Sequence, residues 1–375
     1  MVDSRSLHSM TPLVFVFLGQ KWPHYGSASL RIAAETTPNP LVVLAEVPRP
    51  PNVPSVVEWQ QVGDFYSASE FDGFALAEPY SADFREGFWL KTAERLFVIR
   101  AYMRFSGCKT IFHGELDCLF FSLPKLESEI ARTELTGVFL PRETQDRCIG
   151  SIIFVNEQAS LDALCEFLVK NSALGNEMDI LGALPHGQES KFYALPTAEA
   201  LFRGSEHAPP DTWPVVPPRS TLIVDGAVIG RWLFGVDPRN TGGRGVKNRL
   251  QSHKYGVLFD LPLSEVSITI ERRGGWSLLV EGPNGRRFQV ATIHVHSKIH
   301  AKITARYLAR VVGRIKRGKA TVIIPIEFQF ILATCGKIFR QVVSTTNSIE
   351  KVTLAFQNLR SMDWWKGLRS RLFEQ

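Results

Sequence analysis

The sequence predicts an α/β fold with a mostly parallel sheet flanked by helices, and three successive segments near its start carry that prediction. Leu13–Leu18 is a continuous apolar run that ends at Gly19, which is typical of a buried parallel strand. Ser27–Thr36 has a helical pattern that ends before Pro38, and Leu41–Val47 is a second apolar strand. Strand, helix and strand in this order form a βαβ unit, and sheets of such units carry their active sites at the carboxyl ends of the strands.

The composition is that of a globular protein, because 45% of the 375 residues are hydrophobic and 21% are charged. The five cysteines form no Cys-x-x-Cys pair, which argues against a disulfide scaffold or a zinc module and for a reducing compartment. Leu13–Leu18 is too short for the core of a signal peptide, and Thr321–Ala333 is too short for a membrane helix. We therefore expect a cytoplasmic protein.

Charge divides the chain into two parts. Residues 301–375 contain fourteen Lys/Arg and four Asp/Glu, a net charge of +10, so residues 1–300 carry −4 of the total of +6. We expect one domain over residues 12–300, followed by a basic C-terminal extension of mixed structure over residues 301–375. Trp364 and Trp365 among basic residues suit peripheral contact with an anionic membrane. A packed helical extension with a solvated basic face is the alternative.

The later elements follow from the same patterns. Arg85–Ser106 is the clearest helix, because apolar residues recur on one face and Gly107 supplies the stop. Lys109–His113 and Leu119–Leu123 are predicted strands. The other expected elements are the helices Ser160–Lys170 and Glu177–Leu184, the strands Thr221–Val224, Ser267–Glu271, Ser277–Glu281 and Arg287–His296, and a glycine-rich loop over residues 235–245.

Glu115-Leu116-Asp117 lies between two apolar runs, where a surface turn is unexpected. The single intervening residue puts both carboxylates on one side of an extended segment. Paired carboxylates hold a hard divalent cation such as Mn²⁺ or Mg²⁺, and that cation can neutralise the charge on a departing diphosphate. A solvated turn is the alternative, since such triplets often occur by chance.

Taken in order, these segments resemble a GT-A-fold glycosyltransferase. The segment Phe112–Phe121 carries its DxD-type motif as Glu115-Leu116-Asp117. Asn176–Leu184 is similar to the acidic acceptor-side helix, Val224–Asn240 to the strand and loop that follow it, and Ile293–Lys298 to a closing histidine segment. The resemblance covers about residues 12–300. It implies a nucleotide-sugar donor, a glycan or lipid-linked acceptor, and a role such as polysaccharide biosynthesis.

By this resemblance Asp117 binds the metal directly, whereas Glu115 reaches the metal through water or contacts the donor ribose. The first acid is Glu where the usual pattern has Asp, so its arm is longer. His294 and His296 point to one face of a strand, and we expect His296 to complete the metal's shell. A hydrogen-bonded core histidine is the alternative. His113 is expected to be a structural neighbour of the acids.

Asp179 and Asp225 are the acceptor-side candidates. An inverting transferase needs a carboxylate to take the acceptor proton, and Asp179 can serve as that base. Together with Glu177, it can equally complement the dipole of its helix. Asp225 follows a predicted strand, where it can contact the acceptor or shape an Asp-Gly turn. Arg95 can pair with the donor diphosphate through its planar guanidinium, or lie on a solvated helix face.

These features predict a metal-dependent glycosyltransferase. A sugar nucleotidyltransferase is the rival enzyme, but Leu18–Pro23 after the first strand is poor in the glycine that its phosphate loop needs. A non-catalytic nucleic-acid-binding protein is the alternative from another class, and the acidic body argues against it. GxGxxG, GxxxxGK[ST], HExxH and GxSxG are absent, which removes the commonest dinucleotide, P-loop, zinc-protease and esterase interpretations.

Truncation after His300 tests the membrane interpretation of the extension. Each exposed cation near an anionic membrane contributes about 1 kcal/mol, so removal of residues 301–375 should abolish sedimentation with anionic vesicles at low salt. Hydrolysis of a soluble nucleotide-sugar should persist in the truncated protein. Full-length protein that ignores such vesicles would mark the extension as a packed structural element. Tight binding of single-stranded nucleic acid at about 0.15 M salt would favour the nucleic-acid alternative.

Overall fold

The computed structural model describes residues 10–75, 87–144, 147–201, 215–234, 266–271 and 277–295. Within these residues the chain has an α/β fold, with one eight-stranded sheet, one four-stranded sheet and one two-stranded sheet. The predicted C-terminal extension, the glycine-rich loop over residues 235–245 and His296 lie outside the described residues.

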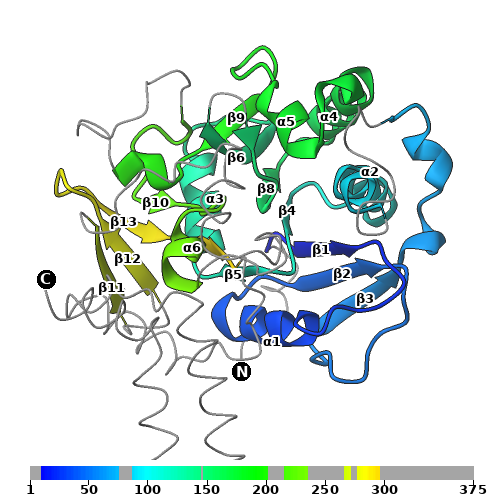
Figure 1. Ribbon diagram of the computed structural model, residues 1–375, viewed down its shortest axis with the longest axis horizontal. Coiled ribbons are helices and arrows are strands. Elements are labelled where there is room, and N and C mark those ends of the chain that lie inside the picture. The colour runs from blue at the N-terminus through cyan, green and yellow to red at the C-terminus, as the bar shows by residue number, and fades with distance from the viewer. Residues whose placement is uncertain are drawn as a thin grey trace, which may run out of the picture. The chain divides into compact units, whose positions relative to one another are not determined.

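The large sheet begins with the predicted βαβ unit (Figure 1). Strand β1 (Leu13–Phe17) pairs in parallel with β2 (Leu41–Ala45), and helix α1 (Gly26–Thr36) connects them. Strand β3 (Val57–Gln61) continues the sheet beyond β2, and β4 (Ile111–Gly114) lies on the other side of β1, both in parallel. The carboxyl ends of these four strands therefore lie along one edge of the sheet.

Beyond β4 the sheet becomes mixed. Strand β8 (Ile152–Val155) runs antiparallel to β4, and β6 (Val138–Thr144) runs antiparallel to β8. Strand β6 also pairs in parallel with β9 (Phe192–Leu195) and antiparallel with β7 (Arg147–Cys148). None of β6 to β9 was predicted, because a short apolar run alone does not distinguish a strand from a buried helical segment.

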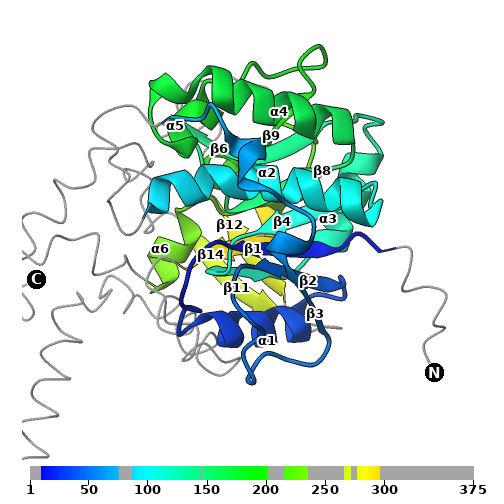
Figure 2. The same ribbon diagram turned by 90° about the vertical axis from the view of Figure 1, so that its right-hand side faces the viewer.

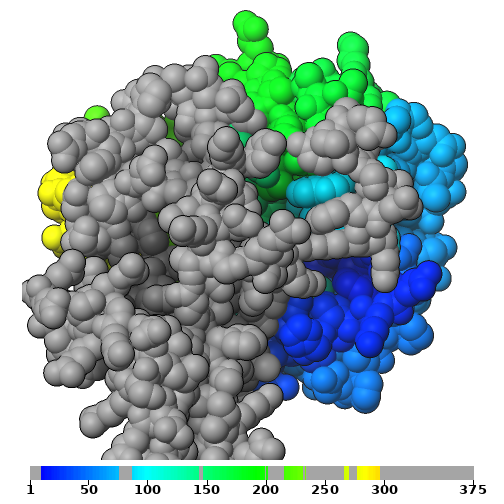
Figure 3. Space-filling view, in the orientation of Figure 1, coloured from blue at the N-terminus to red at the C-terminus, as the bar shows by residue number. Residues whose placement is uncertain are grey.

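Helices cover both faces of the sheet (Figure 2). Helices α2 (Phe88–Ser106) and α4 (Gln158–Lys170) pack on one face, and α1 packs with α3 (Leu123–Ala131) on the other. Val14 of β1 faces α2, whereas its neighbours Leu13 and Phe15 face α1 and α3. Both faces of the strand are buried, which explains its continuous apolar run. On the face seen in Figure 3, only a small cyan patch shows between the blue amino-terminal segments and the green segments.

A second sheet contains β10 (Leu222–Ile223), β13 (Arg287–Val290), β12 (Ser277–Glu281) and β11 (Ser267–Glu271), in that order. The predicted strand Arg287–His296 is wrong as one element, because the chain changes partners at Ala291. The Ala291 amide donates to Ile223, and the Ala291 carbonyl accepts from the amide of Phe121. Strand β14 (Thr292–His294) then pairs antiparallel with β5 (Cys118–Phe120) in a separate two-stranded sheet.

Two other predicted boundaries move. Strand β5 ends at Phe120 rather than at Leu123, because Leu123 and Pro124 begin α3, and proline is favoured in a first helical turn. The predicted helix Glu177–Leu184 is α5 (Glu177–Gly182). The remaining short elements are α6 (Ile229–Phe234), η2 (Val62–Asp64), η3 (Ala68–Phe71), η4 (Ser172–Leu174) and η5 (Ala198–Leu201). Among the described helices, none combines the length and the apolar character needed to cross a membrane.

Gly137 tests the pairing of β6 with β9. A Cβ atom at Gly137 would lie 2.1 Å from the backbone oxygen of Lys191, which accepts the first hydrogen bond of this strand pair from Val138. Gly137→Ala should therefore lower the free energy of unfolding by more than about 1 kcal/mol in a urea titration. Gly63→Ala is the matched control, because no atom of the described residues lies within 4 Å of a Cβ there. Equal stability of the two variants would contradict the described register.

Candidate metal centre

Glu115 and Asp117 lie in the turn between β4 and β5, at the carboxyl end of a strand in the parallel half of the sheet. The Glu115 amide donates to Ser151 at 3.0 Å, and the Cys118 amide donates back to the Glu115 carbonyl at 3.0 Å. The prediction of an extended segment is therefore wrong, since this hydrogen bond closes a turn. The turn lies within buried strands, so Asp117 is buried and the Glu115 side chain is 20% exposed.

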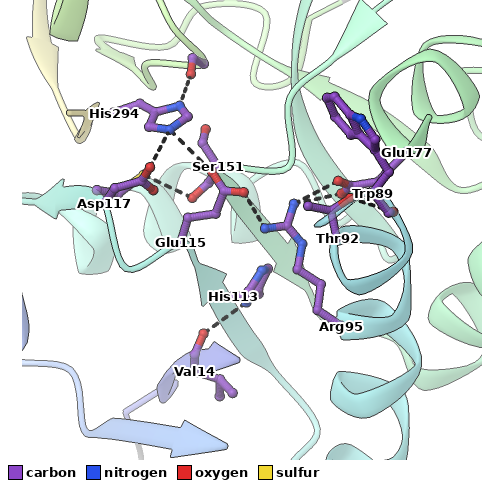
Figure 4. A network of polar contacts seen from close by, with 12 residues as sticks. Val14, Trp89, Thr92, Arg95, His113, Glu115, Asp117, Ser151, Glu177 and His294 are labelled. Carbon is purple, nitrogen blue, oxygen red and sulfur yellow. Dashed lines mark hydrogen bonds and ion pairs between the residues drawn. The ribbon is translucent and has the colours of Figure 1, made fainter. Parts of the chain in front are cut away.

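His294 approaches the two acids from β14. The antiparallel register of β14 and β5 puts His294 opposite Cys118, immediately beside Asp117. Its Nε2 atom lies 3.2 Å from Asp117 Oδ2 and 3.5 Å from Glu115 Oε2 (Figure 4). Its Nδ1 atom lies 2.6 Å from the carbonyl oxygen of Gly226. The imidazole is thus held between one backbone carbonyl and two carboxylates.

These partners decide the protonation of the ring. A carbonyl only accepts hydrogen bonds, so Nδ1 of His294 carries a proton and donates it to Gly226. The other ring nitrogen, Nε2, faces the carboxylates of Asp117 and Glu115. A ligating histidine usually donates its other N–H to a carbonyl or carboxylate, as this one does. The orientation of His294 therefore fits a metal ligand that binds through Nε2.

The donor atoms around this point suit a hard cation. Glu115, Asp117, Cys118 and His294 each offer one ligand atom, and these atoms all lie within 4.8 Å of one another. Burial, followed by the nearby charges of Glu115 and Asp225, raises the pKa of Cys118 well above its ordinary value, so Cys118 stays a thiol that donates to Ser151. Two carboxylates and one imidazole remain, and together they can hold a divalent metal ion.

Arg95 is buried on α2, so the predicted solvated helix face is wrong. Its Nη2 atom lies 2.8 and 3.0 Å from the two carboxylate oxygens of Glu177, and its Nη1 atom pairs with Glu115. Burial opposes the charge, but the carboxylates of Glu177 and Glu115 raise the pKa of Arg95 above its ordinary value. Arg95 therefore connects α2, α5 and the acidic turn as a permanent cation.

Glu177 is the residue of this cluster that sequence reasoning missed. It was interpreted only as a first-turn acid of its helix, yet its side chain is 2% exposed and faces Arg95. Burial raises the pKa of Glu177, and the Arg95 charge acts against that rise. The signal for this pairing lay in α2, where Arg95 precedes the run Leu96–Ile99. Four consecutive apolar residues cover every side of one helical turn, which indicates that this part of the helix is buried. An arginine next to that turn is therefore expected to be buried and to need a carboxylate partner.

Carboxylates predominate in this cluster. Those of Glu115, Asp117 and Glu177 lie around one guanidinium, that of Arg95, and one imidazole, that of His294. A divalent cation between Glu115 and Asp117 would add positive charge where two carboxylates lie close together.

Asp225 lies behind His294 and supports it. Its Oδ1 atom accepts from the amide of Ile229 at 2.9 Å, and its Oδ2 atom accepts from the amides of Gly230 at 2.6 Å and His294 at 3.0 Å. Burial raises the pKa of Asp225, against the effect of these three donors. A Cβ atom at Gly230 would lie 1.8 Å from the His294 carbonyl oxygen, so glycine is needed there. Through these contacts Asp225 connects β14 to the start of α6. The predicted contact of Asp225 with the acceptor stays a prediction.

Asp179 forms the capping box of α5. Its carboxylate accepts from the amide of Asn176 at 3.3 Å, while the Asn176 side chain accepts from the amides of Met178 and Asp179. The helix-start interpretation is therefore confirmed, and the role of Asp179 as a base stays a prediction.

Comparisons with known proteins give little sequence relationship. No protein-family profile matches the chain, and no curated protein sequence matches it. Among solved structures, the chain is similar to the apo form of mouse xyloside xylosyltransferase 1, with a TM-score of 0.31 and 9% sequence identity. That match covers 50% of this chain and 85% of the mouse chain.

His113 is the structural neighbour of the acids that was expected, and its burial predicts a stability that depends on pH. It is buried, it donates from Nδ1 to Val14 at 3.1 Å, and burial followed by the charge of Arg95 lowers its pKa to about 3. Between pH about 6.5 and 3 the unfolded chain binds a proton that the folded chain excludes, so stability falls with falling pH.

His113→Asn should reduce this loss, because the amide can still donate to Val14 and does not titrate. We expect the wild type to lose up to ~1.4 kcal/mol per pH unit more than the variant below pH about 6.5. The measurement is the free energy of unfolding in urea at several pH values. The same exchange at exposed His24 is the control. Parallel pH profiles for wild type and His113→Asn would contradict the description of His113 as a buried neutral group.

Proposed function

We propose that the protein is a metal-dependent glycosyltransferase that moves a sugar from a nucleotide-sugar donor to a hydroxyl group of a glycan or lipid-linked acceptor. One observation carries the proposal. His294 Nε2 faces Asp117 and Glu115 while Nδ1 is anchored on a carbonyl, and this arrangement lies at the carboxyl end of β4. Ligand sites of α/β sheets lie at that edge.

Asp117 and His294 would hold the cation, and Glu115 would approach it directly or through water. A bound Mn²⁺ or Mg²⁺ supplies Lewis-acid stabilisation of the negative charge on the departing nucleoside diphosphate. The contribution of the protein is to orient the metal ligand His294. Asp225 fixes the backbone of His294, and the Gly226 carbonyl fixes its ring. A rigid ligand set of this kind reduces the ordering that is needed when the cation and donor bind.

An aromatic group at the same edge of the sheet is our proposed site for the donor's base. Phe17 ends β1, and its ring centroid lies 5.2 Å from that of Trp22, which lies 5.0 Å from that of Trp59. The three side chains are half-buried, so their rings form a partly open apolar surface. Flat aromatic rings can stack on a nucleobase. Because β1 and β4 are parallel, Phe17 and the acidic turn lie at the same edge of the sheet, and Trp59 lies in the middle of β3.

The acceptor side is proposed on the carboxylates that the sequence singled out. Asp179 is half-buried, and we assign it the base that takes the proton from the acceptor hydroxyl in an inverting reaction. Asp225 would act on the acceptor side indirectly, because its oxygens already accept three backbone N–H groups.

Asp117→Asn should abolish Mn²⁺-dependent donor hydrolysis, because the substitution removes a charged metal ligand and keeps the side-chain shape. The measurement is the release of nucleoside diphosphate from a panel of nucleotide-sugars, with and without Mn²⁺, alongside circular dichroism to verify folding. Asp162→Asn is the control, because Asp162 pairs with Arg104 on the surface. Wild-type turnover of the variant in excess chelator would overturn the metal mechanism. Synthesis of nucleotide-sugar from a nucleoside triphosphate and a sugar phosphate would favour a nucleotidyltransferase.

A further inference from the structure

We propose that Arg95 and Glu177 are positioning residues that hold the Glu115 carboxylate in place for the metal centre without touching the cation. This inference rests on the proposed function, because it assumes that Glu115 helps to bind a divalent metal. It departs from the sequence-based expectation that Arg95 contacts the donor diphosphate, and the two roles give different results in a binding experiment.

The contacts form a chain across three elements. Glu177 of α5 receives Arg95 Nη2 on both of its carboxylate oxygens, and the other terminal nitrogen of Arg95 pairs with Glu115. Thr92, on the same helix as Arg95, also hydrogen-bonds to Glu177 (Figure 4). Glu177 therefore fixes the plane of the guanidinium, and the guanidinium fixes the direction of the Glu115 side chain.

The backbone at Gly150 packs directly against the Arg95–Glu177 ion pair. A Cβ atom at Gly150 would lie 2.7 Å from Glu177 Oε1 and 2.8 Å from Arg95 Nη2. Gly150 thus allows the loop before β8 to lie directly against the ion pair. A guanidinium enclosed in this way has little freedom to turn toward a ligand.

The remaining nitrogen of Arg95 is also turned inward. Its Nε atom is buried and has no hydrogen-bond partner among the described residues, and both terminal nitrogens contact carboxylates. To turn its planar fork toward a diphosphate, Arg95 would have to give up its pair with the buried carboxylate of Glu177, which is strongly destabilising. The geometry therefore assigns Arg95 to Glu115 rather than to a phosphate.

The length of the Glu115 side chain explains why it needs the Arg95–Glu177 pair to hold it. A glutamate has one more rotatable bond than an aspartate, and ordering such a side chain costs conformational entropy. The Arg95 pair supplies that order before a cation arrives. The neighbouring acid, Asp117, has a shorter side chain and lies against His294.

Arg95→Lys is the discriminating variant, because it keeps the positive charge and loses the fork that joins two carboxylates. The probe is Mn²⁺ alone, titrated by isothermal calorimetry or by the electron paramagnetic resonance signal of the free ion. We expect the Kd for Mn²⁺ to rise ~10-fold or more, as is usual when an outer partner of a metal ligand is lost. Glu177→Gln should weaken binding in the same direction and provides the second variant if Arg95→Lys does not fold.

Arg100→Lys is the matched control, since Arg100 lies on the same helix and pairs with Glu70 at 3.1 Å instead of with the acidic turn. Folded Arg95→Lys and Glu177→Gln with Mn²⁺ affinities within about twofold of wild type would overturn the proposal. Unchanged Mn²⁺ binding with weakened binding of pyrophosphate at saturating Mn²⁺ would overturn it in favour of direct phosphate contact. A wild-type protein that binds neither Mn²⁺ nor Mg²⁺ would remove the metal centre itself, and the positioning role with it.

Discussion

The antiparallel pairing of β14 with β5 is the constraint on which the candidate metal centre depends. Ala291 is hydrogen-bonded to Ile223 on one side and to Phe121 on the other, so the chain passes from the four-stranded sheet directly to the acidic turn. This change of partner sets His294 of β14 opposite Cys118 of β5. The imidazole of His294 therefore lies beside Asp117, which precedes it by 177 residues in the sequence. Asp225 secures the same crossing by accepting the amide of His294.

Close to the crossing of β14 and β5, charged side chains and closely packed glycines lie together. Three carboxylates, those of Glu115, Asp117 and Glu177, lie around the guanidinium of Arg95 and the imidazole of His294. Glycines allow the close approaches: Gly150 lies against the Arg95–Glu177 pair, and Gly230 lies against the His294 carbonyl. These close approaches leave the Arg95–Glu177 pair and the backbone of His294 little room to move.

Local patterns predicted much of the first half of the fold. The βαβ start, α2 with its stop at Gly107, and α4 follow from apolar runs and helical periodicity, which depend only on neighbouring residues. Strands β6, β8 and β9 escaped prediction because short apolar runs do not reveal their partners. For the same reason, Arg287–His296 was expected as one strand, although the residue between β13 and β14 decides which sheet each half joins.

By itself, the sequence determined the α/β class, the position of the acid pair between two buried strands, and the presence of carboxylates able to bind a hard cation. Only the tertiary structure decided which histidine meets those acids, that Arg95 is buried, and that Glu177 is its partner. Asp117 and His294 are 177 residues apart, and Arg95 and Glu177 are 82 apart. Contacts over such separations arise from strand register and helix packing, and neither leaves a signal in the residues that flank each group.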